Sequence, residues 1–182
     1  IANMIGNGGF HLVELGAGDG KKTSHLLTTF LERTLDFSYV PIDISAGAIK
    51  DLEHRLMEQF QSTDLEYNGL VCEYFTGLQH LSEMEEKRNM VLFLGSNIGN
   101  FTPGQAHQFL SCLHESLNPG DYLLIGFDLK KDIPTMNRAY NDSQGVTAAF
   151  NKNLLRRINR ELEADFNLDR FTYYSAYNPL EG

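Results

Sequence analysis

Apolar and polar positions along the chain alternate between two periods. Short, mostly apolar runs bounded by turn residues predict buried strands, and these runs are residues 10–15, 38–42, 65–74, 90–94 and 122–128, with a further run at 171–177. Between them, apolar residues recur at helical spacing. This spacing predicts helices over residues 22–35, 45–60, 102–117 and 145–162.

Strands that alternate with helices are typical of βαβ units. The pattern therefore predicts an α/β fold with a doubly wound, mostly parallel, Rossmann-like sheet, in one domain over residues 1–182. In such folds ligands bind at the carboxyl ends of the strands, where the strand order reverses. The residues that directly follow each strand are therefore the first candidates for a functional site.

A glycine-rich turn follows the first predicted strand. Its glycines Gly16, Gly18 and Gly20 are spaced GxGxG, and the acid Glu14 precedes them. Glycine lets the backbone turn tightly and approach a ligand closely. The dinucleotide fingerprint GxGxxG needs a glycine at position 21, where this chain has Lys21. The spacing disfavours NAD and favours the loop that methyltransferases use for S-adenosylmethionine, although many glycine-rich turns bind nothing.

Side chains at the next three predicted strand ends suit an adenosine cofactor. Asp43 can accept hydrogen bonds from both ribose hydroxyls, a need that NAD and S-adenosylmethionine share. Glu73 can accept from the adenine amino group while Tyr74 packs on the ring. The loop at 95–101 has two glycines and two asparagines, which give backbone access and amide hydrogen bonds near the methyl group. Purely structural interpretations remain open for each: a helix N-terminal acid, a surface glutamate beside a core tyrosine, and a plain loop.

Charge and composition limit the classes of partner and the kinds of site that are expected. The formal net charge of −9 disfavours nucleic acid, because an acidic surface repels phosphate. No apolar run approaches the roughly 20 residues of a membrane span, and the glycine- and asparagine-rich start does not resemble a signal peptide. The scattered histidines predict no metal site. Cys72 and Cys112 are expected to be reduced core residues of a cytoplasmic protein.

Five runs of sequence resemble the histidine-specific Nα-methyltransferases, S-adenosylmethionine-dependent enzymes of ergothioneine biosynthesis. These runs are ELGAGDGKKT (14–23), YVPIDIS (39–45), FLGSNIGNF (93–101), DLKKD (128–132) and AYNDSQGVTAAFN (139–151). The resemblance extends from about residue 10 to about residue 177 and implies the class I methyltransferase fold. The last run lies outside the general cofactor motifs, so it is the part most specific to the family.

The resemblance also implies a role for individual residues. On the cofactor side, Gly16 and Lys22 would meet the methionine moiety, Gly18 would shape the loop and Asp43 would hold the ribose. Glu73 and Tyr74 would bind the adenine, at a place where the family usually has Asp-Phe. Toward the substrate, the implied residues are Gly95 beside both ligands, Asn100 at the α-amino group, Tyr140 at the carboxylate or ring, and Thr147.

The expected activity is methylation of the α-amine of L-histidine to hercynine. The residues with which the family recognises the imidazole ring lie outside this chain, which is expected to be an incomplete part of a longer enzyme. Three other classes remain open: a methyltransferase of the same family for another amino acid or aromatic amine, a nucleic-acid methyltransferase, and a non-catalytic binding module. A basic cluster favours nucleic acid, but it is more simply explained as the solvated face of a helix; it consists of Lys152, Arg156, Arg157 and Arg160.

Overall fold

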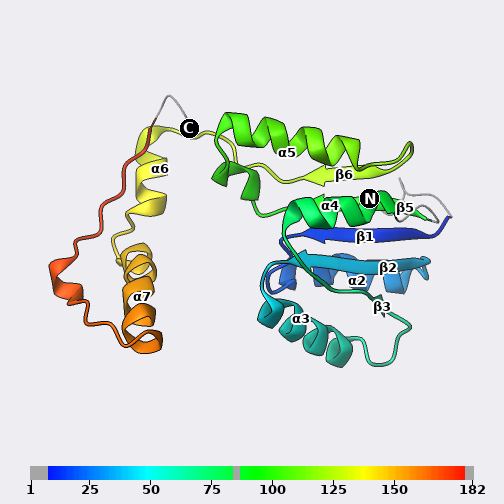
Figure 1. Ribbon diagram of the computed structural model, residues 1–182, viewed down its shortest axis with the longest axis horizontal. Helices are drawn as coiled ribbons and strands as arrows, with labels where there is room; N and C mark the ends of the chain where they lie inside the picture. Colours follow the sequence, from blue (N-terminus) through cyan, green and yellow to red (C-terminus); the bar gives the residue numbers. More distant parts are fainter. Residues whose placement is uncertain (1–7, 84–86, 179–182) are drawn as a thin grey trace. The chain divides into compact units, whose positions relative to one another are not determined.

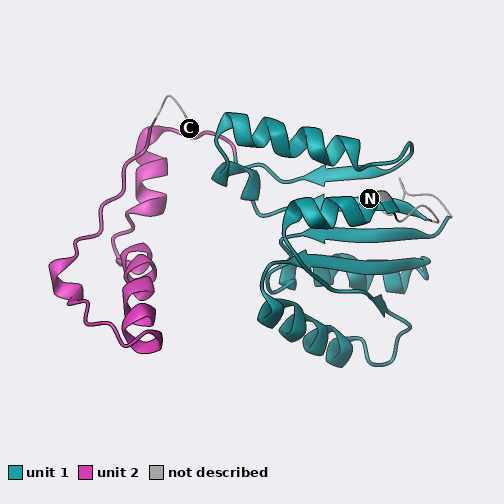
Figure 2. Cartoon of the chain, in the orientation of Figure 1, with its two compact units in different colours: residues 1–128 teal, residues 129–182 magenta. Residues whose placement is uncertain are grey.

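The computed structural model describes residues 8–83 and 87–178, in two compact units that divide after Asp128 (Figure 2). The first unit contains strands β1 (Phe10–Leu15), β2 (Phe37–Asp43), β3 (Glu66–Tyr67), β4 (Leu70–Val71), β5 (Arg88–Phe93) and β6 (Tyr122–Ile125). Its helices are α2 (Lys21–Glu32), α3 (Ala46–Gln59), α4 (Tyr74–Glu83), η1 (Asn97–Asn100) and α5 (Pro103–Glu115). The second unit contains α6 (Ile133–Tyr140), α7 (Val146–Glu161) and η2 (Leu168–Arg170).

The strands of the first unit form one parallel sheet in the order β3-β2-β1-β5-β6, and β4 also pairs with β2 (Figure 1). Strand β1 lies between β2, which follows it in sequence, and β5, to which the chain returns later. The strand order therefore reverses at β1, and the crevice beside its carboxyl end is where this fold binds ligands. This architecture confirms the predicted doubly wound α/β fold.

Two apolar clusters cover the two faces of this sheet. On one face, Leu12 and Met90 pack with Leu27 of α2 and Leu56 of α3. The opposite face is covered by α4 and α5, whose core residues include Leu78, Leu81, Phe109 and Leu113. Neighbouring residues of each strand alternate between the two clusters, as strand geometry requires. Both faces of the sheet are thus buried, which explains why the strands are continuous apolar runs.

Side-chain caps fix the starts of the helices that follow β2 and η1. Ser45 accepts a hydrogen bond from the Ala48 amide at 3.2 Å at the start of α3. Thr102 and Gln105 form a reciprocal capping box at the start of α5, with Pro103 in the first turn. Serine and threonine favour the N-cap position, so the sequence encodes both helix starts locally.

The predicted third strand over residues 65–74 is wrong in its extent. The chain forms two short edge strands, β3 and β4, separated by Asn68 and Gly69, and Tyr74 already begins α4. A Cβ at Gly69 would lie 2.6 Å from the Tyr67 hydroxyl and 2.8 Å from Ile49 Cγ2, so glycine fits the close approach of the chain at this point. As a result, Glu73 and Tyr74 lie in a loop and a helix start rather than on a strand.

Three other expectations also differ from the structure. Strand β6 ends at Ile125, earlier than predicted, and residues 171–177 form no strand. In that segment the Tyr173 hydroxyl donates to the Tyr140 carbonyl at 2.7 Å, which is a contact of an irregular segment rather than of a sheet. Helices α4 and α6 were not predicted.

The second unit has its own capping contacts. Asp132 accepts from the Thr135 amide at 2.9 Å at the start of α6, and Asp142 accepts from the amides of Val146 and Thr147, both at 2.8 Å, at the start of α7. The backbone amide of Thr147 contributes most to lowering the pKa of Asp142 to about 2. Among the residues described, no helix is long and apolar enough to cross a bilayer. A single domain across both units stays a prediction.

Candidate functional site

The glycine-rich turn lies at the carboxyl end of β1, at the point where the strand order reverses. Gly16, Gly18 and Gly20 all have positive φ angles, at 73°, 53° and 53°, which favour glycine over any residue with a Cβ. The Gly16 amide donates to the Ile42 carbonyl at 2.8 Å and so ties the turn to the end of β2. Each glycine is therefore required by the backbone conformation.

A buried carboxylate supports the turn from below. Glu14 is 6% exposed and accepts one hydrogen bond on each oxygen, from the hydroxyls of Thr23 in α2 and Tyr39 in β2. Burial raises the pKa of Glu14, and the two hydroxyl donors oppose this shift. Glu14 thus joins β1, β2 and α2 around the turn, and each of its carboxylate oxygens already has a protein donor.

Asp43 also contacts the turn. Its Oδ2 accepts from the Gly18 amide at 3.1 Å, and its Oδ1 accepts from the Ser45 amide at 2.9 Å. A carboxylate oxygen can accept more than one hydrogen bond, so both oxygens can also receive ligand hydroxyls. Asp43 is therefore positioned by two backbone amides at the end of β2, beside the glycine-rich turn.

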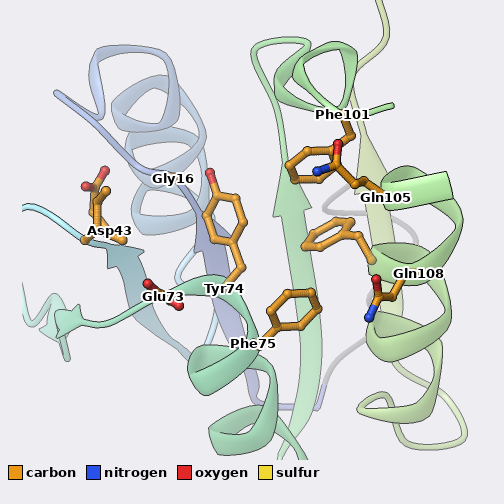
Figure 3. A pocket seen from close by; sticks show the side chains of 10 residues that line it. Gly16, Asp43, Glu73, Tyr74, Phe75, Phe101, Gln105 and Gln108 are labelled. Atoms are coloured by element: carbon orange, nitrogen blue, oxygen red, sulfur yellow. The ribbon is translucent and has the colours of Figure 1, made fainter. Parts of the chain in front are cut away.

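An open cavity of 460 Å³ lies on the α4–α5 side of this turn (Figure 3). Its polar side chains come from opposite sides, with Asp43 and Glu73 on one and Gln105 and Gln108 of α5 on the other (Figure 3). The remaining lining residues are Gly16 and the apolar or aromatic residues Ile44, Tyr74, Phe75, Phe101 and Phe109. This cavity combines aromatic and apolar lining residues with carboxylate acceptors, which suits a base and its sugar.

A second cavity of 270 Å³ lies on the other side of the turn, and Gly16 lines both cavities. Gly18, Lys22 and Gly95 line it, as do Glu14 and Asn97. Lysine and backbone amides at a helix N-terminus suit a carboxylate. The two cavities together offer space for an elongated ligand that passes over Gly16.

Three of the lining residues, Phe75, Gln105 and Gln108, did not stand out in the sequence. Phe75, Gln105 and Gln108 line the larger cavity, and Asn97 lines the smaller one. Nδ2 of Asn97 would lie 3.2 Å from a Cβ at Gly16. Asn97 had a visible signal, because it stands two residues after Gly95 in the loop that follows β5. The two glutamines face the cavity only because α5 packs on this face of the sheet.

The predicted cofactor residues line these cavities; of the predicted substrate residues, only Asn100 belongs to the same unit. Asn100 is exposed at the end of η1 and lines neither cavity. Tyr140 and Thr147 belong to the second unit, where Tyr140 is 59% exposed at the end of α6 and Thr147 lies in the first turn of α7. Their meeting with the cofactor residues stays a prediction.

The site fits an adenosine cofactor with an amino-acid tail. Gly16 has a positive φ, and a Cβ at this residue would lie only 2.6 Å from the Tyr74 hydroxyl. The space beside Gly16 therefore allows a ligand to contact its backbone but has no room for a side chain. The acids Asp43 and Glu73 line the larger cavity, and Lys22 lines the smaller one. Within residues 8–83 and 87–178, no group of three His, Cys, Asp or Glu side chains is placed to hold a metal ion.

Comparison with known proteins identifies a matching family and similar relatives. The family of histidine-specific, S-adenosylmethionine-dependent methyltransferases matches residues 1–182. A histidine N-alpha-methyltransferase of Mycolicibacterium smegmatis is 42% identical over 93% of this chain and 52% of its own length. Ergothioneine biosynthesis protein 1 of Neurospora crassa is 33% identical over 87% of this chain and 18% of its own. An L-tryptophan methyltransferase of Psilocybe serbica is 29% identical over 92% of this chain and 51% of its own.

The mycobacterial and Psilocybe relatives are each about twice as long as the part that this chain matches, so the chain spans about half their length. The match nevertheless covers the whole chain, both the sheet with its glycine-rich turn and the helices of the second unit. The strand order, the cavities at the reversal point and the family match agree with one another. The chain belongs to the family of histidine-specific, S-adenosylmethionine-dependent methyltransferases.

Proposed function

We propose that the protein transfers methyl groups from S-adenosylmethionine to the α-amino group of L-histidine. The observation that carries this proposal is the pair of cavities that meet at Gly16, with Asp43 on one side and Lys22 on the other. Family membership supports the reaction, and 42% identity to a histidine N-alpha-methyltransferase supports the substrate. The nucleic-acid and binding-module alternatives gain no support from these observations.

The cofactor residues divide between the two cavities. In the larger one, Asp43 would hold the ribose hydroxyls, Glu73 would accept from the adenine amino group, and Tyr74 would pack against the base. In the smaller one, Gly16, Gly18, Lys22 and Gly95 would surround the methionine moiety; all four line that cavity. The Lys22 ammonium would pair with the cofactor carboxylate.

Methyl transfer requires little covalent catalysis from the protein. Bound S-adenosylmethionine supplies an activated methyl group on a positive sulfur, so the main task of the protein is to align a neutral amine with it. The uncharged amide of Asn100 would orient the amine without competing for its lone pair. Tyr140 would bind the substrate carboxylate or ring, with Thr147 as a further contact. Water takes the released proton in this proposal.

One second candidate has a specific observation in its favour. The 29% identity to an L-tryptophan methyltransferase covers 92% of this chain, so a related enzyme for another amino acid or aromatic amine would share most of these features. The higher identity to the histidine enzyme favours histidine. A cytoplasmic location is supported by Cys72 and Cys112, which are both free thiols.

A calorimetric titration of the intact protein tests the proposal. The protein is first saturated with S-adenosylhomocysteine, the demethylated product, and then titrated with L-histidine and, separately, with L-tryptophan. We expect heat of binding from histidine and none from tryptophan at the same concentration. Binding of tryptophan alone would transfer the proposal to the second candidate, and a lack of response to S-adenosylhomocysteine would refute both.

A further inference from the structure

The hydroxyl group of Tyr74 has a defined place and, among the described residues, no hydrogen-bond partner. The Tyr74 ring packs edge-on against Phe93 and at a tilt against Phe109, at centroid distances of 5.7 and 5.8 Å. This packing directs the hydroxyl toward Gly16, where a Cβ would lie only 2.6 Å from it (Figure 3). In the part of the chain that the structure describes, the hydroxyl makes no hydrogen bond. A polar group fixed at the edge of a cavity with no partner is suited to a ligand.

The hydroxyl is a hydrogen-bond donor under ordinary conditions. Burial raises the pKa of Tyr74, and the nearby negative charge of Asp43 raises it further. The group therefore stays protonated at neutral pH and offers its proton to an acceptor. Asp43 itself is already held by the amides of Gly18 and Ser45.

The Tyr74 hydroxyl can reach groups in the middle of the larger cavity. Asp43 and Glu73 line the same cavity as Tyr74, and the hydroxyl end of the Tyr74 ring lies close to Gly16 (Figure 3). If Asp43 holds the ribose and Glu73 the adenine, the ribose occupies the space beside Gly16. Ribose oxygens are acceptors as well as donors, so one of them can receive the tyrosine proton while another donates to Asp43.

We propose that the Tyr74 hydroxyl donates a hydrogen bond to a ribose oxygen of S-adenosylmethionine, as a positioning residue beside Gly16. The inference rests on the proposed function, because it requires the adenosine part of the cofactor to lie in the larger cavity. It adds a polar contact to a residue whose expected role was packing against the base. Tyr74 and Asp43 then hold the ribose from two sides and fix where the sulfur lies relative to Gly16.

Deletion of one oxygen atom tests this contact. The intact protein is prepared as wild type, Tyr74→Phe and, as the matched control, Tyr67→Phe, whose hydroxyl donates to the Ile49 carbonyl at 3.0 Å and lines neither cavity. Calorimetry measures the dissociation constants of S-adenosylhomocysteine and of 5′-methylthioadenosine, which keeps the adenine and ribose but lacks the amino-acid part. Free adenine is measured by competition.

We expect Tyr74→Phe to weaken the binding of S-adenosylhomocysteine and of 5′-methylthioadenosine by the same factor, about threefold to tenfold in the dissociation constant. Adenine binding should be unchanged, and Tyr67→Phe should leave all three constants unchanged. Unchanged constants for Tyr74→Phe, a loss limited to S-adenosylhomocysteine, or an equal loss for adenine would each overturn the ribose contact. If the wild type itself fails to bind S-adenosylhomocysteine, the proposed function fails first, so the two failures are distinguishable.

Discussion

The hydrogen bond from Thr23 to Glu14 offers a direct test of how the glycine-rich turn is supported. The Thr23 hydroxyl, 1% exposed, donates to Glu14 Oε1 at 2.6 Å. The substitution Thr23→Val keeps the shape and volume of the side chain and removes only this donor. Glu14 keeps the hydrogen bond from Tyr39 on its other oxygen, so the carboxylate remains in place with one oxygen unpaired.

The cost follows from the charge and burial of the acceptor. A hydrogen bond to a charged group contributes about 1.5–3 kcal/mol, more than a neutral one. Glu14 is 6% exposed, so water cannot easily replace the lost donor. We therefore expect the free energy of unfolding to fall by about 2 kcal/mol at neutral pH. Thr28→Val is the matched control, because the Thr28 hydroxyl donates at 2.9 Å to Ser24 O, a helix carbonyl; its expected loss is below about 0.5 kcal/mol.

Urea denaturation of the intact protein measures both values. With a slope of about 1–3 kcal/mol per molar urea, the expected loss for Thr23→Val moves the midpoint down by about 1 M, and Thr28→Val leaves it nearly unchanged. The two variants must be compared at one pH and without cofactor, since ligand binding adds stability of its own. Equal midpoints for Thr23→Val and Thr28→Val would refute the idea that Glu14 depends on this donor.

Three further predictions concern the ligands and pH. Asp43→Ala should weaken S-adenosylhomocysteine by about 2–4 kcal/mol in calorimetry, because it removes the acceptor of two charge-assisted hydrogen bonds; an unchanged dissociation constant would exclude Asp43 from the ribose site. Asn100→Ala should raise the KM for the amino acid and leave the affinity for S-adenosylhomocysteine unchanged, and Tyr140→Phe should do the same to a smaller extent. Steady-state kinetics measures the KM and calorimetry the affinity; an unchanged KM with a weakened affinity would contradict this assignment. Burial raises the pKa of Glu14 above 4.5 in the folded state, so the folded chain holds its proton more tightly and its stability falls as pH rises through that raised pKa. The urea midpoint of Glu14→Gln should therefore rise relative to that of wild type as pH increases from about 4 to 8, and parallel pH profiles of the two proteins would contradict this.

The sheet and its crossovers were predictable because each strand is buried on both faces. Such strands appear in the sequence as continuous apolar runs, as at residues 10–15 and 90–94, and the helices between them keep a regular apolar spacing. The edge strand was not predictable in this way. It pairs with β2 as two segments of two residues each, on either side of Asn68 and Gly69, and segments this short show no period in the sequence.

The site was predictable where glycine and acid positions follow directly from the strand ends. Gly16, Gly18 and Asp43 were identified because a tight glycine turn after the first strand and an acid at the end of the second are visible in the sequence. Gln105 and Gln108 were not, because their direction depends on how α5 packs against the sheet. Helix α4 was missed because its first residue, Tyr74, was assigned to the end of the preceding strand.

Methyl transfer by the intact protein tests the central proposal most directly. The protein is incubated with isotopically labelled S-adenosylmethionine and each of the standard amino acids in turn, and the products are identified by mass spectrometry. We predict label on L-histidine, with products that carry up to three methyl groups on the α-nitrogen and no label on the imidazole ring. Label on another amino acid or on RNA, with histidine left unmodified, would contradict the assignment.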